Sequence, residues 1–528
     1  MVDASSFWFA NPGGGFAYNG VATQSLRFND DDNANLKFDP SGASNQKTWV
    51  CSAWVKKTAN GNNPNAGNDR LIFNTFTAGN NANCAVMGFR NDKPFYSTYG
   101  VEVLVATQVC RDTSAWYHLV WALDTTQATD TNRLKIYLNG VAITSFSVDN
   151  RDNAYLDQDN DLAINNGNEV RIGNAGASSS PLSPFDGYIA EMNFIDGQSF
   201  FSDTSGTANS SFNINSFGEL KNGVWIPKDT SGLTFGTNGF RLDFADNAVD
   251  APESEGSEDT DNIGSDSSGE HNNFTATGIV ASDCAMPDSP ENNFATMNGI
   301  QSSAGTTTFS EGNLRITNSG ARSYNTSTIA VKTGKWYAEM RWDINNSAET
   351  HFVGVSSNPA RIGADPHTTA GTLWWESNGG GYIDGSAVAS AAFSGGVDWG
   401  QHNVTAPEFV IGIALDLDSG TRTVTFTKDG GNSFSKDLPA SFTDHIVFCM
   451  TKYSSSGSSQ STWNFGQDST FVGEETATTN ADENGFGAFH TAPPSGFLAL
   501  CSANLPEPTI GPNSDTQAND YFETVTYD

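Results

Sequence analysis

Short segments of alternating hydrophobic and polar residues recur along much of the chain, separated by clusters of Asn, Asp and Gly. In the segment 134–138 a Leu, an Ile and a Leu share one face, as the two-residue period of a strand requires. Asn139-Gly140 follows directly and supplies the pair with positive φ that a tight two-residue turn needs. The spacing predicts a β-hairpin that continues into residues 141–143.

Three further segments predict strands. Residues 116–123 are nearly all apolar, which is typical of a central strand covered on both faces. In 336–343 apolar and polar residues alternate, which predicts a strand with one buried face. Residues 424–428 end at Asp429-Gly430, which predicts a second hairpin.

The composition favours strands and turns over surface helices. The 528 residues include 52 Gly, and only 16% of the residues are charged. A chain of this length exceeds one ordinary sandwich core, so more than one core is expected. The sequence therefore predicts an all-β protein with two antiparallel β-sandwich domains of jelly-roll type.

A stretch without Lys or Arg suggests where the two sandwiches separate. Residues 247–270 carry many Asp and Glu, and such a stretch cannot bury enough apolar surface to fold alone. We expect this stretch to lie outside both cores. The predicted domains are a first sandwich at 1–215, an acidic loop-rich connection at 216–305, a second sandwich at 306–475 and a Pro-containing extension at 476–528.

The charge balance excludes some classes of partner. The 60 acidic and 26 basic residues give a formal charge of −34, which would repel a phosphate backbone, so nucleic acid is not an expected partner. The charge suits solubility alone, or a saline, calcium-containing medium. The chain begins without the features of a signal peptide, and no apolar run is long enough for a membrane span. Its six Cys residues form no CxxC pair, so buried free thiols are expected.

Five segments of the first half, in this order, resemble the laminin-G and concanavalin A-like lectin family. They are KTWVCSAWV at 47–55, WYHLV at 116–120, LKIYLNG at 134–140, VRIGN at 170–174 and FDGYIAE at 185–191. The resemblance covers roughly residues 20–200 and implies a lectin-type sandwich.

The second half resembles a SPRY domain over about residues 310–470. The segments that carry the resemblance are GKWYAE at 334–339, VGV at 353–355, IGIALDLDSG at 411–420, FTKDG at 426–430 and LP at 438–439. The family usually has an aromatic residue and Asn near this hairpin, where the chain has Thr and Asp, and the turn is unaffected.

Segments outside these two matches resemble virion proteins of marine phages. They are SFWF at 6–9, SLRFNDDD at 25–32, GFRLDF at 239–244, DSPENNFAT at 288–296 and GFLALCSANLP at 496–506. This resemblance implies a virion surface protein that is made in the host cytoplasm and released on lysis. Such proteins often continue past the position where this chain ends. Other virion proteins and further copies of the chain are then expected partners.

Two acidic loops are candidate Ca²⁺ sites, because the related sandwiches often hold Ca²⁺ at a loop edge. Carboxylate oxygens at alternate positions can converge on one hard cation. Solvated acidic turns are the alternative. The candidate ligands are Asp30 and Asp32 in the first loop, and Asp157, Asp159 and Asp161 in the second.

Aromatic residues provide the candidate ligand-binding surfaces. Trp374 and Trp375 are flanked by glycines and could present ring faces to a sugar or peptide, as could Tyr96 and Tyr99 in the first half. The alternative is that these rings pack inside the sandwiches.

The sequence offers no catalytic constellation. A glycoside hydrolase on this scaffold needs two carboxylates flanking the scissile bond, and the nearest runs, 191–196 and 339–343, lack the usual strand spacing. Neither an HExxH nor a GxSxG motif is present. The chain is therefore predicted to be a non-enzymatic phage tail-fibre or appendage protein that binds a host-cell surface glycan or receptor. The alternatives are a structural or decoration protein of the particle and, third, a polysaccharide depolymerase.

Overall fold

The computed structural model describes residues 19–60, 69–76, 80, 83–175, 183–221, 223–252, 256–300, 306–319, 323–343, 351–357, 366–398, 409–452 and 458–505. These residues form two compact units, which divide between Asn292 and Asn293 and are called unit 1 and unit 2. Each unit contains two large, mainly antiparallel sheets with a hydrophobic core that draws on both. The predicted all-β class with two sandwiches is confirmed.

The first sheet of unit 1 contains the most buried strands. Its strands are β1 (Leu26–Phe28), β3 (Thr48–Lys57), β8 (Trp116–Asp124), β9 (Leu134–Leu138), β10 (Val141–Ala142), β13 (Gly187–Asp196) and β16 (Phe240–Leu242). They follow the order β1-β13-β3-β8-β9-β10, with β16 also paired to β13.

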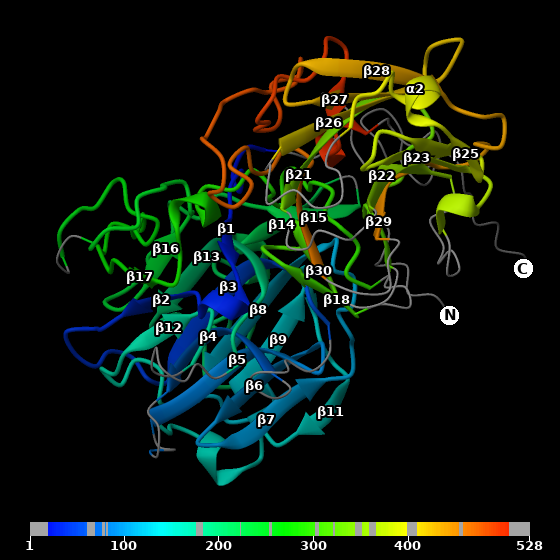
Figure 1. Ribbon diagram of the computed structural model, residues 1–528. Coiled ribbons are helices and arrows are strands. Elements are labelled where there is room, and N and C mark those ends of the chain that lie inside the picture. The colour runs from blue at the N-terminus through cyan, green and yellow to red at the C-terminus, as the bar shows by residue number, and fades with distance from the viewer. Residues whose placement is uncertain are drawn as a thin grey trace, which may run out of the picture. The chain divides into compact units, whose positions relative to one another are not determined.

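The second sheet of unit 1 covers the other side of the same core. Its strands are β2 (Asn35–Phe38), β4 (Asp69–Phe76), β5 (Cys84–Arg90), β6 (Lys93–Thr98), β7 (Val101–Ala106), β11 (Phe146–Asp149), β12 (Val170–Ile172) and β17 (Thr275–Thr277). The order is β11-β7-β6-β5-β4-β12-β2-β17, and β4 to β7 lie side by side in Figure 1. A separate hairpin pairs β14 (Gly218–Lys221) with β15 (Val224–Pro227). The short helices of unit 1 are η2 (Asp30–Asp32), α1 (Asp130–Arg133), η4 (Ala154–Leu156), η5 (Ile214–Ser216) and η6 (Ala281–Asp283).

Strand β8 is covered on both faces, as its nearly continuous apolar sequence predicts. Leu119 and Trp121 point into the main core between the sheets. Val120 packs on the opposite face in a second cluster with Phe200 and Phe212, which follow β13 in the chain. Residues beyond the lectin-like motifs therefore supply the outer cover of this sheet.

The segment predicted as an acidic connection is instead part of unit 1 up to residue 292. The expectation that 247–270 lies outside both cores is wrong at Ile263, which is 1% exposed within the main core. Farther along, Asp283 accepts a 3.0 Å hydrogen bond from Arg27 Nε, and Asp288 lies 2.7 Å from Lys56 Nζ. Asp283 and Asp288, which follow the acidic stretch, neutralise buried bases of β1 and β3 and fix this part of the segment to unit 1.

The first sheet of unit 2 contains the strand predicted at 336–343. Its strands are β18 (Thr306–Ser310), β19 (Arg315–Ser319), β21 (Lys335–Asp343), β26 (Phe409–Asp416), β27 (Thr423–Lys428), β28 (Asn432–Asp437), β30 (Ser458–Asn464) and β31 (Leu498–Ala499). The order is β18-β19-β30-β21-β26-β27-β28, and β31 pairs with β21 in parallel.

The second sheet of unit 2 follows the order β20-β29-β22-β23-β24-β25. These strands are β20 (Ser323–Thr326), β22 (His351–Ser356), β23 (Thr372–Glu376), β24 (Gly381–Ile383), β25 (Ser386–Val388) and β29 (Val447–Lys452). The short helices of unit 2 are η7 (Pro366–Thr368), α2 (Ser390–Phe393) and η8 (Ser502–Asn504).

The predicted strand at 336–343 is confirmed as β21, but the expectation of one buried face is wrong, because both of its faces are buried. Trp336 and Met340 lie in the core between the sheets. Tyr337, on the opposite face, packs with Phe489 and Ala499. The described part of the predicted C-terminal extension thus covers the outer face of this sheet.

Several local predictions are confirmed. Asn139 and Gly140 have φ of 48° and 79°, and Asp429 and Gly430 have φ of 50° and 63°, so both hairpins use the expected turn conformation. The six cysteines are buried thiols that form no disulfide. Among the described residues, no helix has the length and apolar character to cross a membrane. The segment 6–9, which carries part of the resemblance to phage virion proteins, lies outside the described residues.

Candidate functional site

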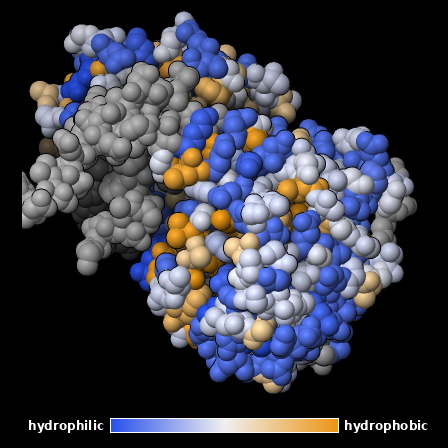
Figure 2. Space-filling model, turned by 180° about the vertical axis from the view of Figure 1, so that it is seen from behind, coloured by the Kyte–Doolittle hydropathy of each residue, from blue (hydrophilic) through white to orange (hydrophobic). Residues whose placement is uncertain are grey.

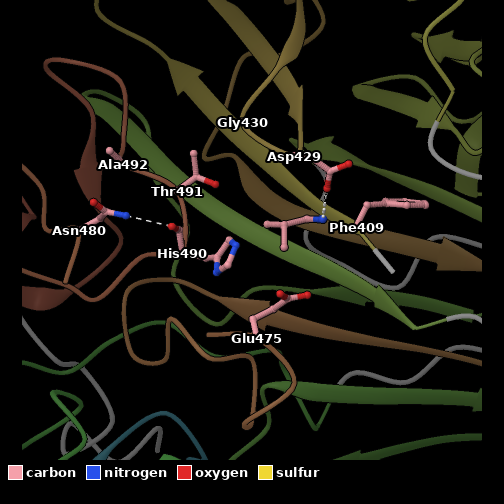
Figure 3. Close-up of a pocket in the computed structure, with 9 residues that line it drawn as sticks. Phe409, Asp429, Gly430, Glu475, Asn480, His490, Thr491 and Ala492 are labelled. Carbon is pink, nitrogen blue, oxygen red and sulfur yellow. Dashed lines mark hydrogen bonds between the residues drawn. The ribbon is translucent and has the colours of Figure 1, made fainter. Parts of the chain in front are cut away.

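A polar cavity of about 450 Å³ opens in unit 2 between the first sheet and the C-terminal wall, the name used here for residues 475–492. Figure 3 shows the residues that line it. Two lie at the start of β26, two form the turn between β27 and β28, and five belong to the C-terminal wall. They are Phe409, Val410, Asp429, Gly430, Glu475, Asn480, His490, Thr491 and Ala492. We call this cavity the unit 2 pocket.

A buried carboxylate fixes the C-terminal wall to β21. Glu339 is fully buried, and its carboxylate accepts hydrogen bonds from the backbone N–H groups of His490 and Thr491 at 2.8 Å and 2.7 Å. Asn464 Nδ2 and the Tyr337 hydroxyl donate to the same group at 3.1 Å and 3.2 Å. Burial raises the pKa of Glu339 to about 7, although these donors oppose the shift. Because all its lone pairs are directed to the fold, Glu339 supports the pocket rather than reaching a ligand.

The carboxylates that line the pocket differ in how they are held. Glu475 lies 2.9 Å from Nε of the buried Arg341, which neutralises its charge. Asp429 is exposed and accepts a 3.0 Å hydrogen bond from Val410 N–H with one oxygen, as Figure 3 shows. The Asp429 side chain belongs to the lining of the cavity.

His490 contributes a buried polar atom to the pocket lining. Its carbonyl oxygen accepts a 2.9 Å hydrogen bond from Asn480 Nδ2, which holds the wall in place. Its Nδ1 is buried and has no hydrogen-bond partner within the described part of the chain.

A second cavity of about 580 Å³ shares Asp429 with the unit 2 pocket. Lys428, in its lining, donates a 3.0 Å hydrogen bond to the Asp398 carbonyl and lies 4.5 Å from the centre of the Phe409 ring. Two cavities that meet at one carboxylate suit an extended ligand with repeating hydrogen-bonding groups.

Three of the predicted aromatic ligand residues are buried. Trp374 and Trp375 are 0% exposed, the first in a cluster on the outer face of the second sheet and the second in the main core of unit 2. Tyr96 is 0% exposed in the core of unit 1. None of these rings offers a face to a ligand. Successive side chains of a strand point to opposite faces of the sheet, and here both faces are covered by other residues, so both sets of side chains are buried.

Tyr99 differs from the other aromatic candidates. It lies half-buried in the turn between β6 and β7, and its ring stacks on that of Tyr155 with centroids 5.0 Å apart. Tyr155 is 42% exposed. The sequence analysis did not select Tyr155, because nothing local to residue 155 indicates that the two loops meet.

The two predicted Ca²⁺ loops lack a converging set of ligands. Among the described residues, no group of three or more His, Cys, Asp or Glu side chains is arranged to hold a metal ion. Asp30 lies 3.6 Å from Arg70, and Asp32 accepts a 2.8 Å hydrogen bond from Asn29. In the other loop Asp159 has φ of 62°. The backbone therefore turns at Asp159, between the carboxylates of Asp157 and Asp161 that were expected to converge on one cation. The candidates Asp157, Asp159 and Asp161 are all exposed.

A buried Ser–His pair in unit 1 does not have the protonation that nucleophilic catalysis needs. His118 Nδ1 accepts a 2.9 Å hydrogen bond from Trp225 Nε1, which can only donate. Burial lowers the pKa of His118 to about 3, so the ring is neutral and its proton is on Nε2. Nε2 lies 2.9 Å from Ser52 Oγ and therefore donates to it, whereas a general base would have to accept.

The comparisons with known proteins give distant structural likenesses. No family model and no curated protein sequence matches the chain. Among solved structures, the chain is similar to the SPRY domain of human HERC1, with 19% identity and a TM-score of 0.26, over 33% of this chain and 97% of that one. It is also similar to a SAP-like pentraxin from Limulus polyphemus, with 12% identity and a TM-score of 0.24, over 39% and 79% of the two chains.

A third similar structure is a putative carbohydrate binding protein from Bacteroides ovatus, with 17% identity and a TM-score of 0.31, over 50% of this chain and 61% of that one. Likenesses at these scores carry no inference about ligand or activity. Function is therefore argued from the residues of the chain itself.

Proposed function

We propose that this chain binds glycans without hydrolysing them, at the surface of a bacterial virus particle, and that the unit 2 pocket is a glycan site. The observation that carries the proposal is the convergence of hydrogen-bonding side chains on one cavity. Asp429, Thr491 and His490 line it beside the apolar Phe409 and Val410. Sugars present hydroxyl groups around an apolar ring face, so they match such a lining.

The lining charges indicate which sugars fit. The two lining carboxylates belong to Asp429 and Glu475, and the nearby Arg341 is paired with Glu475. An acidic sugar in the unit 2 pocket would meet Asp429 with no unpaired Lys or Arg in the pocket lining, since Lys428 lines only the adjoining cavity. We therefore expect neutral or amino sugars to bind and acidic sugars to be rejected.

Binding without hydrolysis is supported by the state of the acidic groups. A glycosidase needs a protonated carboxyl that can reach the glycosidic oxygen and a second carboxylate opposite it. Beside the unit 2 pocket, the carboxyl with a raised pKa is Glu339, which is fully buried behind four donors. The virion location is supported by the resemblance of the segments at 25–32, 239–244 and 288–296 to marine phage proteins, and by the formal charge of −34.

The test uses the full chain with three hexasaccharide probes: a β-1,4-glucan, a β-1,4-glucosamine and a polygalacturonate. Asp429→Asn keeps the oxygen that accepts from Val410 N–H and suits a residue with positive φ, and Thr491→Val removes only a hydroxyl. Each should weaken binding by about tenfold, the equivalent of one hydrogen bond to a ligand. Asp437→Asn, at the exposed far end of β28, is the matched control.

Four outcomes would overturn parts of the proposal. No binding of any probe overturns glycan binding, and unchanged binding by both pocket variants overturns the site. Release of reducing ends overturns the non-enzymatic assignment. Antibodies that fail to label particles from the virus that encodes the chain overturn the virion location. Labelled particles that bind no glycan favour a decoration protein.

A further inference from the structure

The turn between β6 and β7 holds a tyrosine in an unfavourable backbone conformation. Tyr99 has φ of 52° and Gly100 has φ of 75°. Two of the other tight turns in the chain use Asn139 and Asp429 at the equivalent position, and these residue types tolerate positive φ. A bulky side chain there costs about 1–3 kcal/mol and persists only when its surroundings hold it. The strain indicates that the ring of Tyr99 is needed at this place.

The ring of Tyr99 is fixed by three contacts. Its backbone N–H donates to the Cys84 carbonyl at 2.9 Å, and its hydroxyl donates to the Asp161 carbonyl at 3.2 Å. The ring stacks on Tyr155 with an interplanar angle of 18°. One face of each ring is used in this stack.

The loop that carries Tyr155 is held rigidly by hydrogen bonds. The Tyr155 N–H donates to Asn153 Oδ1 at 3.1 Å, and the Tyr155 carbonyl accepts from Asn160 Nδ2 at 3.0 Å. Asp159 N–H donates to the Thr125 carbonyl at 2.8 Å, and Thr125 Oγ1 donates to the Asn160 carbonyl at 2.9 Å. An exposed ring on a fixed loop is preorganised, so a ligand need not order it.

We propose that the Tyr99–Tyr155 stack is a second glycan site, in unit 1, where a neutral or amino-substituted pyranose stacks on the outer face of Tyr155. This inference rests on the proposed function, that the chain binds glycans. The apolar face of a pyranose matches an aromatic ring, and the exposed Gln158 and Asp159 on the same loop offer hydrogen-bond partners. The exposed carboxylates of Asp157, Asp159 and Asp161 exclude acidic sugars.

The site differs in kind from the unit 2 pocket. The pocket surrounds a sugar with polar groups, whereas the stack offers one open aromatic face, so binding there depends on Tyr155 alone. A chain with two such sites gains avidity on a repeating polysaccharide only where both can engage the same surface.

The test counts sites by calorimetric titration of the full chain with the glucan and glucosamine hexasaccharides. Wild type should show two sites, Asp429→Asn should retain the unit 1 site, and Tyr155→Ala should retain the unit 2 pocket. In the double variant both sites should bind the probes about tenfold more weakly than in wild type. Tyr155→Phe keeps the ring and should bind as wild type does, whereas loss of the ring in Tyr155→Ala should weaken the unit 1 site by at least about tenfold.

The outcomes separate this inference from the proposed function. If Asp429→Asn abolishes all binding, or if Tyr155→Ala leaves two sites, the unit 1 site does not exist although glycan binding stands. If Tyr155→Phe fails as Tyr155→Ala does, the ring face is not the binding surface. If wild type binds neither probe, both proposals fail. Equal melting temperatures of the two Tyr155 variants confirm that the loop remains folded.

Discussion

His118 is fully buried, and both of its ring nitrogens are used within unit 1. Its ring stacks 4.6 Å from Trp54, and its Nδ1 accepts from Trp225. A second proton on the ring would displace the Trp225 N–H and leave a buried charge without a partner. This arrangement ties the stability of unit 1 to pH.

We predict that acidification destabilises unit 1 through His118. The folded pKa of His118 is about 3 against an ordinary 6.5, so its contribution is present above pH 6.5 and is lost as the pH falls. Between pH 7 and pH 5 the loss should be about 2 kcal/mol of unfolding free energy. Denaturant unfolding of wild type and His118→Gln at each pH measures it. The difference in unfolding free energy between wild type and His118→Gln should shrink toward pH 5. A difference that stays constant with pH would exclude this role for His118.

The elements that sequence patterns describe least well are held by contacts between residues far apart in the chain. The segment 281–292 has no strand, yet Asp283 and Asp288 from it form buried ion pairs with Arg27 and Lys56. Trp116 Nε1 also donates to Asp288 at 3.2 Å. Such a segment behaves as part of the core.

Asp288→Ala should destabilise unit 1 by about 3–5 kcal/mol, because it leaves Lys56 buried without its counter-charge. Glu258→Ala, at an exposed acidic residue of the same region, should change the stability by less than about 0.5 kcal/mol. Chemical denaturation of the full chain compares the two. Equal effects would mean that the segment is a linker, as the sequence pattern had indicated.

The C-terminal wall of the unit 2 pocket should respond to pH in the opposite direction from His118. The folded pKa of Glu339 is about 7 against an ordinary 4.5, so its stabilising contribution is present below pH 4.5 and is lost as the pH rises through 7. The loss should be about 3 kcal/mol for unit 2. This loss of stability can be measured by hydrogen exchange of the β21 amides, compared between wild type and Glu339→Gln at each pH. The variant should lack this pH dependence.

These elements show what the sequence could and could not predict. The hairpins at 139–140 and 429–430 and the burial of β8 follow from turn chemistry and local periodicity, which are properties of adjacent residues. The unit 2 pocket joins a predicted turn to Glu475 and His490, which lie in irregular chain with no period. The sequence left open whether Trp374 and Trp375 bind a ligand or pack inside the sandwich, because the pattern does not reveal what covers a strand. Residues far away in the chain decide whether such side chains are buried, and the local sequence does not indicate which distant residues these are.

At the scale of the whole molecule, the chain carries a large negative charge. The formal charge is −34, and Figure 2 shows a mostly hydrophilic face with scattered hydrophobic patches among the described residues. Several bases are removed from the surface, because Arg27, Lys56 and Lys57 are fully buried in ion pairs. Exposed carboxylates therefore repel one another with few cations between them.

We predict that salt stabilises the chain by screening this repulsion, and that Ca²⁺ acts in the same general way. Screening lengths fall from about 30 Å at 0.01 M to about 8 Å at 0.15 M ionic strength, so the melting temperature should rise over this range. A specific Ca²⁺ site would add stability by mass action at micromolar to millimolar concentrations. The described residues offer no converging group of ligands for such a site. NaCl and CaCl₂ at matched ionic strength should therefore shift the melting curve by similar amounts. A much larger shift in CaCl₂, removed by Asp159→Ala, would restore the loop at 157–161 as a cation site.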